Sequence, residues 1–102
     1  KLSILITDDN EQLRSYLVQV FQGSFIVYEA KTAEEGLKIA KQILPDVIIS
    51  DVMMPQMDGL QTLAALRQLP GLAGVPVIFM TARLQEAEQQ RYLSAGAIAV
   101  IE

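Results

Sequence analysis

Three carboxylates and one hydroxyl each stand directly after an apolar run of this sequence: Asp8, Asp9, Asp51 and Thr81. In open parallel sheets the functional crevice lies at the carboxyl ends of the strands. If the apolar runs are neighbouring strands, these side chains therefore converge on one edge. Like charges held close together repel, and we expect no Lys, Arg or His beside them. Such an acidic cluster indicates a bound cation.

The types of residue available indicate which cation would bind. The chain contains no His and no Cys, and oxygen ligands alone favour Mg²⁺ over zinc or copper. Met53, Met54 and Met57 lie nearby in the sequence, but methionine more often fills gaps in a core than binds a metal. Taken singly, the Asp-Asp pair could cap a helix, Asp51 could end a strand in a turn and Thr81 could cap a helix. Their shared position favours one common site.

Several functional classes lack their required residues. No glycine-rich dinucleotide motif and no P-loop motif occurs in the chain. Without His no serine-hydrolase triad can be assembled. The 12 acidic and 8 basic residues give a net charge of −4, which argues against contact with nucleic acid. No apolar stretch approaches the ~18–20 residues of a membrane span, so we expect a cytoplasmic protein with no membrane contact.

The apolar patterns predict five strands alternating with four helices. We expect strands at residues 2–7, 25–28, 47–50, 77–80 and 97–101. We expect helices at 11–21, at 32–43 with a Thr32–Glu35 capping box, at 60–66 with a stop at 69–71, and at about 83–94. Continuous apolar strands are typical of a parallel sheet covered on both faces. The sequence therefore predicts one α/β domain over residues 1–102, of the doubly wound type.

Four motifs in a fixed order carry a family resemblance. They are Ile-Leu-Ile-Thr-Asp-Asp-Asn at 4–10, Pro-Asp-Val-Ile-Ile-Ser-Asp-Val-Met-Met-Pro-Gln-Met-Asp-Gly at 45–59, Pro-Val-Ile-Phe-Met-Thr-Ala at 76–82 and Ala-Gly-Ala at 95–97. With them the chain resembles the receiver domains of response regulators in two-component signalling, the CheY-like class. The resemblance implies a flavodoxin-like parallel sheet with strand order 2-1-3-4-5. It also implies a phosphoacceptor signalling domain, not an enzyme with a separate substrate.

The resemblance assigns roles to the acidic residues. Asp51 would accept a phosphoryl group from a partner's phosphohistidine and form an acyl phosphate. Asp9, Asp51 and the backbone carbonyl of Met53 would bind Mg²⁺, and Asp8 would act through a metal-bound water. The Thr81 hydroxyl and the Ala82 backbone N–H would hydrogen-bond the phosphoryl oxygens.

The resemblance also implies partners. The phosphodonor would be a sensor histidine kinase or a phosphotransfer protein. The phosphorylated domain would switch an output domain or another partner, or form a homodimer through the face of the fourth helix and fifth strand.

The C-terminal part of the chain departs from the family pattern. Members of the family carry a Lys near the end of the fifth strand. In this sequence the corresponding position would lie one residue after Glu102. The position three residues before it, often Tyr or Phe, is Val100. We therefore expect switching through loops and the fourth helix, with no aromatic residue near Val100 changing its burial. The family's fifth helix is absent from this chain, so we expect the intact protein to continue beyond Glu102 or another copy to cover the exposed sheet face.

Two other functions remain open from the sequence. A pseudo-receiver would act only as a protein-interaction module, and the intact acidic set with Thr81 argues against it. A Mg²⁺-dependent aspartyl phosphatase of the haloacid-dehalogenase type would need Asp-x-Asp at its nucleophile. Met53 occupies the second of those aspartate positions.

Overall fold

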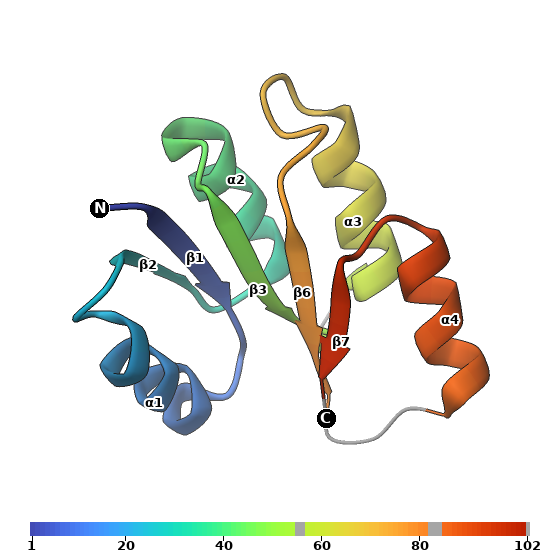
Figure 1. The fold of residues 1–102 in the computed structure, drawn as a ribbon, viewed down its shortest axis with the longest axis horizontal. Helices are drawn as coiled ribbons and strands as arrows, with labels where there is room; N and C mark the ends of the chain where they lie inside the picture. Colours follow the sequence, from blue (N-terminus) through green and yellow to red (C-terminus); the bar gives the residue numbers. More distant parts are fainter. Residues whose placement is uncertain (55–56, 82–84, 102) are drawn as a thin grey trace.

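The chain folds into a central parallel sheet with helices on its two faces (Figure 1). This computed structural model describes residues 1–54, 57–81 and 85–101. The strands of the central sheet are β1 (Ser3–Thr7), β2 (Ile26–Ala30), β3 (Val47–Asp51), β6 (Val77–Met80) and β7 (Ala99–Ile101). The helices are α1 (Glu11–Phe21), α2 (Ala33–Ile43), α3 (Gly59–Gln68) and α4 (Glu86–Ser94). Two short strands, β4 (Met53–Met54) and β5 (Met57–Asp58), form a separate antiparallel ladder.

The strand order of the central sheet is β2-β1-β3-β6-β7, and every pair in it is parallel. Counted without the short ladder, this is the predicted order 2-1-3-4-5, so the predicted fold class is confirmed. The register pairs Thr7 with Ser50 and Asp51 with Met80. The carboxyl ends of β1, β3 and β6 therefore lie side by side at one edge of the sheet.

Strands β1, β2, β3 and β6 each contribute to two cores, because successive side chains of a strand point to opposite faces of the sheet. On one face, Leu5, Ile48 and Phe79 pack with residues of α2, α3 and α4. On the other face, Ile4 and Ile6 pack with α1. Strands buried on both sides read as continuous apolar runs, which is why the sequence predicted them well.

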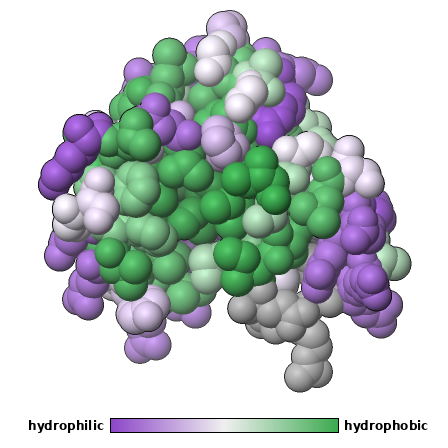
Figure 2. Space-filling view, in the orientation of Figure 1, coloured by the Kyte–Doolittle hydropathy of each residue, from purple (hydrophilic) through white to green (hydrophobic). Residues whose placement is uncertain are grey.

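The α1 face of the sheet is covered only in part. Ile78 and Met80 of β6 are only partly buried there, and Ile101, which pairs with Met80, is 48% exposed. Figure 2 shows a broad apolar area on the face that is turned toward the viewer in Figure 1. The expectation that further chain or another copy covers this face stays a prediction.

The ends of several elements differ slightly from the expected ones. β2 continues to Ala30 because the carbonyl of that buried residue accepts a hydrogen bond from Asp8 N. β7 begins later than expected because Ala97 N bonds to Tyr92 O, so that Ala97 belongs to the turn that ends α4. The start expected for the fourth helix lies outside the described residues.

Helix caps follow the sequence closely. Asn10 caps α1 by accepting from Leu13 N, and Thr32 caps α2 by accepting from Glu35 N. The carboxylate of Glu35 accepts from Lys31 N and not from Thr32 N. The expected capping box is therefore formed in one direction only. Among the described residues, no helix combines the length and the apolar character that crossing a membrane requires.

Candidate functional site

The carboxylates of Asp8, Asp9 and Asp51 lie together at the carboxyl edge of the sheet. One oxygen from each lies within 4.8 Å of the corresponding oxygens of the other two. They meet because β1 and β3 are adjacent: Asp8 and Asp9 follow β1, and Asp51 is the last residue of β3. Asp8 is buried, Asp51 is half-buried and Asp9 is exposed. The structure thus brings together the three carboxylates that the sequence placed at strand ends.

The electrostatics of Asp8 favour an added cation. Burial raises the pKa of the Asp8 carboxyl group above its usual range, and the negative charge of Asp9 raises it further. A hydrogen bond of 2.8 Å from Asn10 N to Asp8 Oδ1 and the positive charge of Arg14 act in the opposite direction. The shift is upward on balance. A cation bound at the cluster would stabilise the ionised carboxylates.

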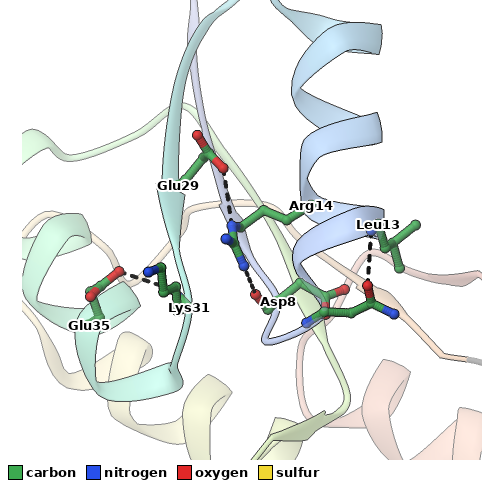
Figure 3. A network of polar contacts seen from close by, with 7 residues as sticks. Asp8, Leu13, Arg14, Glu29, Lys31 and Glu35 are labelled. Atoms are coloured by element: carbon green, nitrogen blue, oxygen red, sulfur yellow. Dashed lines mark hydrogen bonds and ion pairs between the residues drawn. The ribbon is translucent and has the colours of Figure 1, made fainter.

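Arg14 lies beside this cluster, which shows that the expectation of no nearby basic residue was wrong. Its Nη1 donates to the backbone carbonyl oxygen of Asp8 at 2.8 Å, and its Nε donates to Glu29 Oε1 at 3.1 Å (Figure 3). Arg14 is on α1, and Glu29 comes from β2. The only sign in the sequence was helical spacing, because Arg14 shares the buried side of α1 with the apolar Leu17.

Thr81 follows β6 at the same edge as the carboxylates. Its side chain is half-buried, and its backbone N–H donates to Ile101 O at 2.9 Å, which ties it to β7. Met53 lies two residues after Asp51. It begins β4 and pairs with Asp58. Ala82 lies outside the described residues. The roles assigned to these three residues stay predictions.

The methionines differ in their surroundings. Met54 is buried and Met57 is half-buried. The burial of Met54 agrees with its interpretation as a residue that fills space in the core.

The start of α3 is held by an aromatic contact that the sequence did not predict. Gly59 N donates to Val52 O at 2.7 Å, and Asp58 caps α3. Tyr92 of α4 packs against Gly59 so closely that a Cβ atom there would lie 2.6 Å from Tyr92 Cε1. The rings of Tyr92 and Phe79 meet edge to face, with centroids 4.9 Å apart. No sequence pattern connects α4 with the start of α3.

The hydroxyl of Tyr92 contributes to the same contact. Burial raises the pKa of the Tyr92 hydroxyl, and the negative charges of Asp58 and Glu88 add to this effect. A hydrogen bond from the Leu60 backbone N–H acts in the opposite direction. The hydroxyl therefore joins α4 to the first turn of α3.

Comparison with known proteins decides the family. A family model described as the response regulator receiver domain matches residues 4–102. The chain is a response regulator receiver domain. Receiver domains are signalling domains of two-component systems, and the match spans the sheet, the four helices and the acidic edge.

Individual relatives agree with the family match. The chemotaxis protein CheY of Halobacterium salinarum is 30% identical over 95 residues, which cover 92% of this receiver domain and 78% of that protein. The solved structure of the chemotaxis protein CheY4 of Vibrio cholerae superposes with a TM-score of 0.91 at 28% identity. That match covers 97% of this receiver domain and 83% of the solved chain.

A larger relative shows the domain as part of a longer protein. The KDP operon transcriptional regulatory protein KdpE of Escherichia coli is 36% identical over 96 residues, which cover 93% of this receiver domain. The receiver domain spans only 41% of the length of KdpE. Similarity to KdpE therefore concerns the receiver part alone.

Proposed function

We propose that this receiver domain accepts a phosphoryl group on Asp51 and thereby switches a partner or an output domain. The observation that carries the proposal is the grouping of the Asp8, Asp9 and Asp51 carboxylates within 4.8 Å. The donor would be the phosphohistidine of a sensor histidine kinase or a phosphotransfer protein. The reaction would take place in the cytoplasm.

The residues at the acidic edge fit a Mg²⁺ ion, because the donor set consists of oxygen atoms. Asp9, Asp51 and the backbone carbonyl of Met53 would hold the ion directly, and Asp8 would hold it through a water molecule. When bound, Mg²⁺ supplies charge neutralisation that lets a carboxylate approach an anionic phosphoryl group.

Asp51 itself would perform the covalent step. A carboxylate oxygen of Asp51 forms a bond to phosphorus while the phosphorus–nitrogen bond of the donor breaks. The imidazole leaves and takes up a proton, so the product is an acyl phosphate on Asp51. The half-buried position of Asp51 at the end of β3 supports this role, since the carboxylate is reachable and still fixed by the strand.

Thr81 and Ala82 would receive the new phosphoryl group. The Thr81 hydroxyl and the Ala82 backbone N–H would donate hydrogen bonds to its oxygens. Because Thr81 N is bonded to Ile101 O, a movement of Thr81 would also reach β7. The switched surface would then be α4 with β7, which could bind an output domain or a second copy.

The test is phosphorylation of the intact protein with acetyl phosphate and Mg²⁺, read by mass spectrometry. We expect an adduct of ~80 Da on Asp51, which does not form when EDTA is present during the reaction or in Asp51→Asn. Asp46→Asn is the matched control, because Asp46 lies before β3, at the opposite end of the strand, and its carboxylate accepts from Ser3 N. An adduct that forms without Mg²⁺, or equally in Asp51→Asn, would contradict the proposal. No adduct at all would favour the interaction-only alternative.

A further inference from the structure

Arg14 is a buried cation directly behind the acidic edge. Its side chain is only 6% exposed, whereas that of its ion-pair partner Glu29 is 46% exposed. Nε donates to Glu29 Oε1 at 3.1 Å and Nη1 to the Asp8 carbonyl at 2.8 Å. Figure 3 shows the guanidinium between Glu29 and the turn that follows β1.

A buried cation whose ion-pair partner is exposed has no clear advantage for stability alone. Removing a guanidinium from water is costly, and apolar residues of similar volume often stabilise a protein equally well. Arg14 nevertheless points back from α1 to one backbone carbonyl, that of Asp8. The contact therefore points to a role in fixing the orientation of the Asp8–Asp9 peptide group.

The turn after β1 is held at three points. Asp8 N donates to Ala30 O at 3.1 Å, and Asn10 N donates to Asp8 Oδ1 at 2.8 Å. The third point is the bond from Arg14 to Asp8 O. The carbonyl of Asp8 belongs to the same planar peptide group as the N–H of Asp9. Fixing that plane fixes the N–Cα bond of Asp9, about which the Asp9 side chain is oriented.

We propose that Arg14 is a positioning residue for Mg²⁺ binding, acting through the Asp8 carbonyl on the orientation of Asp9. This inference rests on the proposed function, because it concerns the same acidic edge. Outer contacts of this kind orient metal ligands, and their removal typically weakens metal affinity by about 10- to 100-fold.

Charge and geometry make opposite predictions for Arg14. As a positive charge close to the site, Arg14 should repel Mg²⁺, so its removal should strengthen binding if charge alone mattered. Glu29 pairs with Arg14 and offsets much of that charge. The positioning role predicts the reverse, a weaker affinity when the bond to the Asp8 carbonyl is lost. The sign of the change therefore separates the two roles.

The experiment titrates Mg²⁺ into the intact, unphosphorylated protein and follows the backbone amide resonances of Asp9 and Asn10 by NMR. We expect Arg14→Met to weaken Mg²⁺ binding about tenfold. Arg14→Lys keeps a cationic donor and should recover part of the loss. It also keeps the test decisive if Arg14→Met does not fold.

The matched control is Arg67→Met. Arg67 also donates to backbone carbonyls, those of Leu72, Val75 and Gly96, but these lie before β6 and β7, at the opposite end of the sheet. This variant should lose stability and keep its Mg²⁺ affinity.

Three results would overturn the positioning role: unchanged or tighter binding in Arg14→Met, no recovery in Arg14→Lys, or an equal loss in Arg67→Met. If the unsubstituted protein bound no Mg²⁺, the proposed function would fail, and this inference with it.

Discussion

Gly36 of α2 lies against Thr7 of β1 in a contact that leaves no room for a side chain. A Cβ atom at residue 36 would lie 2.7 Å from Thr7 Oγ1 and 3.1 Å from Thr7 Cγ2. Thr7 is buried, and the cavity beside it measures about 10 Å³, near the lower limit for a single water molecule. Thr7 therefore has little space into which it could move. We expect Gly36→Ala to destabilise the domain.

The magnitude follows from two opposing terms. Overpacking a buried contact costs about 1–3 kcal/mol, and replacing Gly by Ala inside a helix returns about 1 kcal/mol. Gly36→Ala should therefore lower the free energy of unfolding by up to about 2 kcal/mol. In Thr7→Ala the two close atoms are absent, and the remaining Cβ of residue 7 would lie 3.5 Å away, an ordinary contact. In that background Gly36→Ala should be stabilising by about 1 kcal/mol.

A double-mutant cycle on the intact protein measures this coupling. Urea unfolding of the unsubstituted protein, both single variants and the double variant should give a coupling of about 1–3 kcal/mol between residues 7 and 36. Gly23→Ala is the control, because a Cβ there meets nothing within 4 Å. It should change stability by no more than about 0.5 kcal/mol. Effects of Thr7→Ala and Gly36→Ala that add within about 0.5 kcal/mol would refute the steric argument.

Two further predictions concern Asp8 and Tyr92. The raised pKa of Asp8 means that the folded protein holds this proton more tightly than the unfolded chain, so stability is lost as pH rises through the folded pKa. With EDTA present, Asp8→Asn should therefore melt at a higher temperature than the unsubstituted protein at pH 7. This difference in melting temperature should vanish below the ordinary aspartate pKa of 3.8. A difference of the same size at all pH values would contradict the prediction. Tyr92→Phe removes the acceptor of the Leu60 N–H and should lower the free energy of unfolding by about 1 kcal/mol. Tyr16→Phe, at a residue 61% exposed, should cause no change in the same urea titration.

The fold could be predicted from the sequence because the three central strands, β1, β3 and β6, carry apolar side chains on both faces of the sheet. Continuous apolar runs placed β6 at Val77–Met80, and helical spacing with Asn10 as the cap placed α1 at Glu11–Phe21, both as observed. The ends of β2 and β7 depend on bonds from distant parts of the chain, such as Asp8 N to Ala30 O. Local patterns carry no information about such bonds. The two-residue strands β4 and β5 are too short to produce a periodic pattern.

The candidate site could be predicted to the extent that it depends on strand ends. Asp8, Asp9 and Asp51 had to converge once β1 and β3 were placed in one parallel sheet. Arg14 could not be placed beside them, because its carboxylate partner Glu29 arrives on β2 through strand pairing.

Helix α4 is attached to the domain mainly through one side chain. Of its residues 86–94, all of them described, Tyr92 alone is buried, and a helix shorter than about 12 residues has little stability of its own in water. Local opening of α4 should therefore need far less free energy than global unfolding, and its amide hydrogens should exchange with solvent long before those of β1 and β3. If Asp51 is phosphorylated as proposed, a change at the Tyr92 contact would be enough to shift the balance between docked and open conformations of α4, at a modest cost in free energy.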